Sequence, residues 1–289
     1  MFDFPETLVI GRSISKWIDQ VVDWVVVNWD PFFSAINIGV LRILVPFQDF
    51  LQWLPWWFVI IMVGLLAWRM VSVKFGIVAA GLLLVVSFLG LLDLAMITLA
   101  IVLTAALLCV VIGLPVGIAA AKSNRVDSIM RPVLDSMQTM PSFVYLIPAV
   151  MLFGLGKTPA VMATMIYALP PIIRLTNLGI RQVDPSVVEA GRASGTTSWQ
   201  LLRKIQIPLA MPTILAGLNQ TIMMALAMVV IASMIGARGL GIEVLNGINR
   251  LEVGRGFLGG ISIVFLAVIL DRISQGFASR KSQTRSISG

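Results

Sequence analysis

The sequence predicts an all-α integral membrane protein, a polytopic bundle of about seven membrane-spanning helices. Its 289 residues are 58% hydrophobic and only 12% charged, and the mean hydropathy is +0.96. Soluble globular domains carry roughly 45–50% apolar and about 25% charged residues. The apolar residues also gather into long runs, and a helix needs roughly 20 of them to cross a bilayer. Composition and run length therefore indicate the same fold class.

The first 52 residues predict an extracytoplasmic or interfacial segment ahead of the spans. Within residues 13–29, Trp17 and Val21 lie on one side of a helical pattern and Lys16 lies on the other. Such an amphipathic helix lies in the membrane surface. We expect it to anchor the chain, and this role is favoured over a regulatory one.

Seven apolar runs follow as candidate spans. The first two form an accessory pair within residues 53–91, and the others belong to a core of residues 92–273. The fourth run contains Pro141 and Pro148, so we expect it to be bent or partly re-entrant. Residues 274–289 predict a basic, disordered cytoplasmic tail. The runs are residues 53–68, 76–92, 94–121, 141–156, 159–180, 209–236 and 256–272.

Residue types that carry most active-site chemistry are scarce. The chain has no histidine, so a His-based acid–base or metal site is excluded, and its single cysteine, Cys109, excludes an internal disulfide. Gly156-Lys157-Thr158 looks like the end of a phosphate-binding loop, but Met151 stands where that motif requires a glycine. We therefore expect no catalytic residue, metal or cofactor in this chain, and a membrane-embedded enzyme has little support.

A polar segment, residues 182–208, interrupts the apolar core. Asp184 and Pro185 are typical of the cap and first residue of a helix, and Gly195 permits either a turn with positive φ or a close approach to a partner. Trp199 supplies an apolar anchor. Amphipathic helices that seat in a partner's groove are a recurring binding mode. We expect two short helices joined by a turn.

This segment resembles the cytoplasmic coupling loop of ABC importer permeases, although an ordinary charged connecting loop is the alternative. The family pattern is Glu-Ala-Ala, a glycine four residues later, and Ile-x-Leu-Pro ten residues beyond that glycine. Gly191 replaces the second alanine, Ile207 replaces the leucine, and Arg192 lies inside the pattern. The residues that match are Glu189, Ala190, Gly195, Ile205 and Pro208.

From about residue 92 to residue 272 the chain resembles the quaternary-amine branch of this superfamily. The resemblance implies the type I ABC importer permease fold, import of glycine betaine, proline betaine or choline, and a place in the bacterial inner membrane. It also implies two ATPase subunits that use ATP and Mg, an extracytoplasmic substrate-binding protein, and a second copy of the chain. The supporting segments besides the coupling loop are residues 137–148, 168–174, 208–214 and 229–236.

Charge sets the expected orientation. The formal net charge is +7, but lysines and arginines lie between apolar runs, so basic cytoplasmic loops are favoured over nucleic-acid binding. With the coupling loop inside, 14 of the 21 lysines and arginines fall on the cytoplasmic side. We expect the N-terminus outside and the C-terminus inside.

The sixth run contains candidate residues for the translocation path, with hydrogen bonding between helices or core packing as the alternative. Gly113 and Gly117 would let another helix approach closely, and packing within the subunit is favoured over a dimer seam. Residues 238–255 are either a docking site for the receptor or a solvated loop. The path candidates are Asn219, Gln220, Thr221, Met224 and Met228.

Two other functions remain open. A sibling permease for another small solute, such as an amino acid, would share the coupling loop, and uptake competition by betaines would separate the two. An ion-coupled secondary transporter is disfavoured because the spans lack paired acidic residues. Transport without any ATPase subunit would favour it.

Overall fold

The computed structural model describes residues 11–286, and every regular element in that range is helical. This confirms the all-α prediction. Short 3-10 or π turns, η2 (Ser142–Tyr145), η3 (Leu202–Gln206) and η4 (Ser233–Ile235), join some of the helices. The α-helices are α1 (Gly11–Asn28), α2 (Asp30–Trp53), α3 (Trp56–Met70), α4 (Val73–Phe88), α5 (Leu92–Lys122), α6 (Asn124–Thr139), α7 (Leu146–Phe153), α8 (Lys157–Arg181), α9 (Pro185–Ala193), α10 (Ser198–Leu201), α11 (Ile207–Ala232), α12 (Leu240–Asn249) and α13 (Val253–Ser286).

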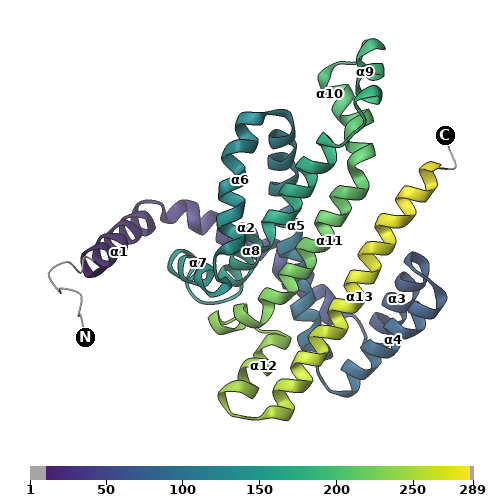
Figure 1. Ribbon diagram of the computed structural model, residues 1–289. Coiled ribbons are helices and arrows are strands. Elements are labelled where there is room, and N and C mark those ends of the chain that lie inside the picture. The colour runs from purple at the N-terminus through teal and green to yellow at the C-terminus, as the bar shows by residue number, and fades with distance from the viewer. Residues whose placement is uncertain (1–10, 287–289) are drawn as a thin grey trace, which may run out of the picture.

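Helices α5, α8 and α11 form the centre of the bundle (Figure 1). Small residues allow this close packing: a Cβ added to Gly117 of α5 would lie 2.7 Å from the Thr176 Cβ of α8. Where α8 meets α11, a Cβ on Gly217 of α11 would lie 3.0 Å from the Leu175 Cβ. Gly113 likewise faces Ile172 of α8. The prediction that Gly113 and Gly117 pack within the subunit is therefore confirmed.

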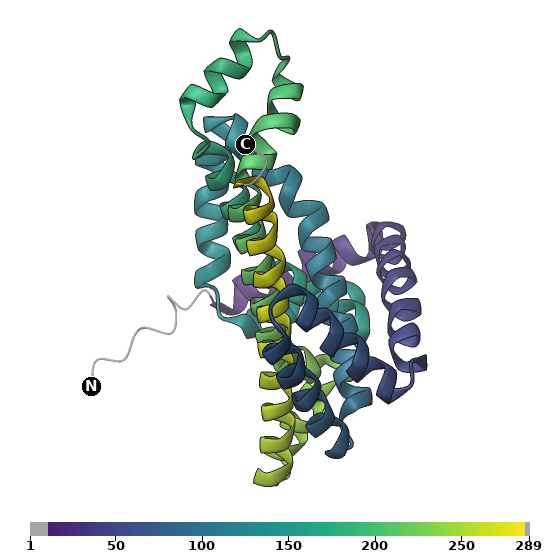
Figure 2. The same ribbon diagram turned by 90° about the vertical axis from the view of Figure 1, so that its right-hand side faces the viewer.

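The number of spans differs from the seven predicted. Five described helices are long and apolar enough to cross a membrane, or six if α6 and η2–α7 count as one broken span. The first two predicted runs form α3 and α4, of 15 and 16 residues. At about 1.5 Å per residue each is shorter than a bilayer core of roughly 30 Å. They lie as a hairpin beside α13 (Figure 2).

The fourth predicted run is not a straight span. Its residues form η2 and α7, whose direction differs by 108° from that of α6. The break falls at Met140, which is extended (φ −69°, ψ 130°) because the following Pro141 disfavours helical backbone at that position. The expected bend is confirmed, but it lies between α6 and η2, ahead of the run rather than inside it.

A further helix, α2, occupies residues 30–53, where the sequence predicts only an interfacial segment. Its 24 residues are long and apolar enough to cross a membrane. Arg42 and Asp49 interrupt the apolar run in the sequence, yet both are exposed in the helix, whereas Leu44 is fully buried. A search for continuous apolar runs misses α2 because these charged residues interrupt the pattern. The amphipathic helix is confirmed as α1, and residues 1–10 lie outside the described range.

The predicted tail also differs. Helix α13 continues to Ser286, so residues 274–286 are helical rather than disordered, and residues 287–289 lie outside the described range. Gly276 packs against the tip of the α3–α4 hairpin, where an added Cβ would lie 2.5 Å from the Met70 carbonyl oxygen. This tertiary contact supports helical structure beyond the apolar part of α13.

Candidate functional site: the coupling segment

Residues 182–208, the coupling segment, project from one end of the bundle (Figures 1 and 2). They form the two short helices that the sequence predicts, α9 and α10, followed by η3 and the first residues of α11. This end also holds the end of α5 and the beginning of α6, because Arg181 of α8 contacts Ala120 and Asn124. The segment is therefore available to a partner that approaches this end of the bundle.

Local hydrogen bonds define where both short helices begin. The Asp184 carboxylate accepts a hydrogen bond of 2.8 Å from the Ser186 N–H. Hydrogen bonds from Ser186 hold the pKa of the Asp184 carboxyl below its usual value. At α10, the Thr197 hydroxyl accepts from the Gln200 N–H at 3.3 Å, and the Gln200 side chain accepts from the Thr197 N–H at 2.9 Å.

Gly195 ends α9 in a left-handed conformation with φ +75°. The Gly195 N–H donates to the Arg192 carbonyl at 2.9 Å, and the Thr196 N–H donates to the Gly191 carbonyl at 3.3 Å. These two bonds make up a Schellman motif, which favours glycine at this position. An added Cβ would meet nothing within 4 Å. Of the two roles considered for Gly195, the structure supports the turn with positive φ.

Gly191 provides the contact between α9 and the turn η3. A Cβ added there would lie 2.7 Å from the Ile205 Cδ1 and 2.8 Å from the Leu201 Cδ1. Ile205 therefore holds α9 against η3, and Pro208 stands in the first turn of α11. The residues of the pattern region divide into those that build the segment, which are Gly195, Ile205, Pro208 and the substituted position Gly191, and those that lie on its surface.

Glu189, Ala190 and Arg192 are on that surface and are exposed. Two apolar side chains are exposed as well: Val187 is 39% exposed and Trp199 is 63% exposed. The Lys122 Nζ lies 5.7 Å from the centre of the Trp199 ring, a cation–π contact that orients the indole. Apolar anchors beside charged residues are typical of a protein docking surface.

The five path candidates do not share one environment. Asn219 donates to the Asp271 carboxylate of α13 at 2.9 Å and accepts from the Ser274 hydroxyl, so it links two helices. Met228 is fully buried in the core, Met224 is half-buried and Gln220 is exposed. Thr221 is also fully buried, and its hydroxyl has no hydrogen-bond partner. Interhelical bonding and core packing thus account for Asn219 and Met228.

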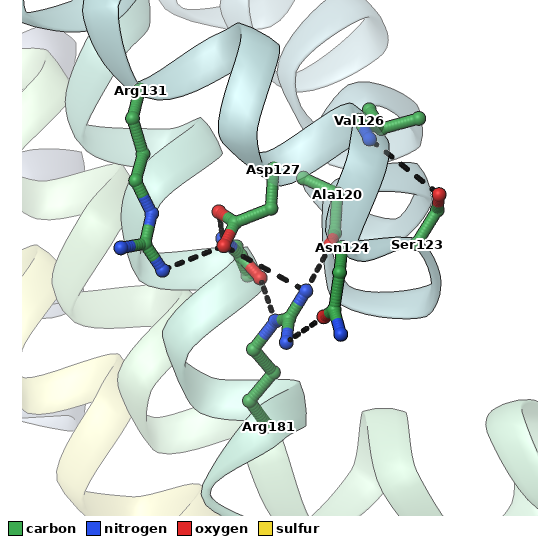
Figure 3. Close-up of polar contacts among 8 residues, drawn as sticks. Ala120, Ser123, Asn124, Val126, Asp127, Arg131 and Arg181 are labelled. Atoms are coloured by element: carbon green, nitrogen blue, oxygen red, sulfur yellow. Dashed lines mark hydrogen bonds and ion pairs between the residues drawn. The ribbon is translucent and has the colours of Figure 1, made fainter.

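One polar cluster is absent from the sequence predictions. Asp127 of α6 is only 5% exposed and accepts hydrogen bonds from Arg131 at 2.6 Å and from Asn177 at 2.7 Å (Figure 3). Arg181 lies beside them at the end of α8, 3.8 Å from the same carboxylate. The only sequence signal is the Asp127–Arg131 spacing of four residues, which predicts an ion pair on a helix surface but no burial.

The predicted receptor-docking region, residues 238–255, forms α12 and the start of α13. The Arg255 guanidinium donates two hydrogen bonds to Glu243, at 2.6 and 3.1 Å, and so clamps the two helices together. These bonds keep the pKa of the Glu243 carboxyl below its usual value. Arg238 and Arg250 remain exposed.

Comparison with known proteins agrees with this architecture. Residues 113–283 match the family described as "Binding-protein-dependent transport system inner membrane component". The glycine betaine/proline betaine transport system permease protein ProW of Escherichia coli (strain K12) is 50% identical, over 98% of this chain and 78% of that protein. The glycine betaine/carnitine transport permease protein GbuB of Listeria monocytogenes serotype 1/2a (strain 10403S) is 48% identical, over 91% and 95%.

Among solved structures, inward-facing conformations of the MetNI methionine ABC transporter are similar in fold. One superposes with a TM-score of 0.59 at 20% sequence identity, covering 64% of this chain and 93% of that chain. The rest of this chain, which the superposition does not cover, contains helices that lie outside the shared core. With the family match over more than half of its residues and these relatives along nearly its whole length, the chain belongs to the inner membrane components of binding-protein-dependent transport systems.

Proposed function

We propose that the chain is the permease subunit of an ATP-driven ABC importer for a quaternary amine such as glycine betaine, proline betaine or choline. The observation that carries this proposal is the coupling segment, which projects from the bundle with Val187, Glu189 and Trp199 exposed. The substrate class follows from relatives at 48–50% identity that are named for glycine betaine transport. The reaction moves the solute and changes none of its bonds.

The proposed assembly has two ATPase subunits, an extracytoplasmic substrate-binding protein and a second copy of this chain, embedded in lipid. ATP and Mg would be used by the ATPase subunits, because Met151 stands where a phosphate-binding loop requires its first glycine and Lys157 begins a helix long enough to cross a membrane. Arg238 and Arg250 are candidates to bind acidic residues of the receptor. ATP-driven closure of the ATPases would move the coupling segments as rigid bodies and alternate the access of the path.

The function is tested by uptake. The tagged chain, purified with its native partners and placed in proteoliposomes with ATP inside, is expected to accumulate radiolabelled glycine betaine, and unlabelled proline betaine or choline should compete. Methionine and histidine serve as unrelated competitors. Accumulation that amino acids block and betaines do not would support the sibling-permease alternative. Accumulation without the ATPase subunits would support a secondary transporter.

We also propose that the N-terminus is outside and the C-terminus is cytoplasmic. A labelling experiment tests on which side of the membrane the N-terminal helix α1 and the coupling segment lie. Cysteine at Lys16 should react with a membrane-impermeant maleimide in intact cells, and cysteine at Thr197 only after permeabilisation. Cys109 is fully buried, and burial raises the barrier to its background labelling. A crossing of the membrane by α2 would reverse the result at position 16, and external labelling at position 197 would contradict the proposed coupling role.

A further inference from the structure

A polar bridge, in which Asp127 is buried and Arg181 is partly exposed, fastens the last turn of α8 to the corner between α5 and α6 (Figure 3). Arg181 is its centre. The Arg181 guanidinium donates to the Ala120 carbonyl of α5 at 2.7 Å, to the Asn124 side chain of α6 at 2.8 Å and to the Asn177 side chain at 2.8 Å. One arginine therefore contacts three helices with a planar fork that lysine does not possess. We call Asp127, Asn177 and Arg181 the corner bridge.

Asp127 supplies the negative charge of the corner bridge. Its carboxylate accepts from Asn177 of α8 at 2.7 Å and lies 3.8 Å from Arg181, so its contacts cross from α6 to α8. A cavity of about 430 Å³ opens beside it between the same two helices. A buried charge that loses a partner is strongly unfavourable, so this contact holds α6 to α8. A second ion pair between the same helices, Arg174 with Asp135, is exposed to a greater extent, and Asp127 is therefore the buried charge of the two links.

The corner bridge stands next to the coupling segment in the chain. Only three residues separate Arg181 from Pro185, the first residue of α9, and one of them, Val183, is buried. A displacement of α9 therefore reaches the end of α8 over a short, partly packed linker. The corner bridge would then transmit this displacement from α8 to α6. Helix α6 is followed, after the 108° bend, by η2 and α7.

We infer that Asp127 and Arg181 are positioning residues for transport, which make α6 and α7 move together with the coupling segment. This inference rests on the proposed function. A second connection runs directly from α10 through η3 into α11. Without the corner bridge, the coupling segment would still move α11 but not α6 and α7. ATP hydrolysis would therefore continue while less solute is transported per ATP hydrolysed.

The test is the ratio of solute transported to ATP hydrolysed, measured in the same proteoliposomes with the assembled complex. Asp127→Asn removes the charge and keeps the shape of the side chain. We expect ATP hydrolysis within about twofold of the parent complex and a ratio reduced roughly tenfold, within the range typical of coupling between sites. Arg181→Lys keeps the positive charge but loses the planar guanidinium, so it should reduce the ratio by a similar factor. It replaces Asp127→Asn as the test if the complex with Asp127→Asn does not assemble.

The matched control is Arg131→Gln. Arg131 pairs with Asp127 from the same helix, one turn away, so its removal disturbs the carboxylate without cutting the link from α6 to α8. Its ratio should stay near that of the parent. Uptake and hydrolysis that fall in parallel, an unchanged ratio in both bridge variants, or an equal loss in Arg131→Gln would each overturn the inference. Failure of the proposed function is distinguishable, since the parent complex itself would then show no ATP-dependent uptake of a quaternary amine.

Discussion

Replacing Glu189 by lysine is expected to reduce ATP-dependent uptake by roughly tenfold to a hundredfold while the chain stays folded. Glu189 is exposed on α9, beside the exposed Val187, on the surface proposed to meet the ATPase. Like charges that face each other in an interface are unfavourable, and a loss of about 1.4–2.8 kcal/mol corresponds to a tenfold to hundredfold weaker binding. Exposed substitutions usually change folding stability by no more than about 0.5 kcal/mol.

Two measurements on the Glu189→Lys complex separate the steps. Co-purification with the ATPase subunit reports association, and uptake relative to ATP hydrolysis reports coupling. Asp23→Lys makes the same charge reversal at an exposed position on α1, which is not among the helices apolar enough to cross a membrane, and should leave both measurements near the parent value. If Glu189→Lys supports uptake at the parental rate, Glu189 has no part in coupling.

Replacing Gly117 by leucine is expected to have the largest effect on folding. A Cβ at this position would lie 2.7 Å from the Thr176 Cβ and 2.9 Å from the Ile173 carbonyl oxygen. The second of these is backbone, so no side-chain rotation relieves the contact, and α5 must separate from α8. Overpacking of a close-packed interior typically costs about 1–3 kcal/mol and occasionally more, and we expect at least about 3 kcal/mol here.

Thermal denaturation in detergent and the yield of monodisperse protein measure this effect. Gly81→Leu is the matched control, because Gly81 also lies in an apolar helix but an added Cβ there meets nothing within 4 Å. We expect Gly81→Leu to keep the yield and midpoint of the parent protein. Equal midpoints for the two leucine variants would show that the α5–α8 contact tolerates separation.

Much of the candidate site was predictable from local patterns. The Asp184-Pro185 start of α9, the turn at Gly195 and the two-helix form of the coupling segment all depend on residues near one another in the chain. The close approach at Gly113 and Gly117 was predictable for a related reason, since small residues four apart present a flat helix face. Which helix fills that face was not predictable, because α8 is about 60 residues away.

The corner bridge escaped prediction for the same physical reason. Arg181 and Ala120 are 61 residues apart, and Asp127 and Asn177 are 50 apart. Alone, Asp127 and Arg131 are typical of a solvated helix surface. The burial of Asp127 follows only after α8 packs against α6, which no spacing within α6 reveals.

The amino-acid sequence by itself determined the membrane class, most of the core helices and the two-helix form of the coupling segment, because apolar content, capping residues and glycine conformation act over a few neighbouring residues. Only the tertiary structure decided that residues 30–53 form one long helix, α2, that the angle between α6 and η2–α7 is 108°, and that Arg181 links α8 to α5 and α6. These features depend on which surfaces meet, and that is set by packing and by the pairing of buried polar groups far apart in the chain.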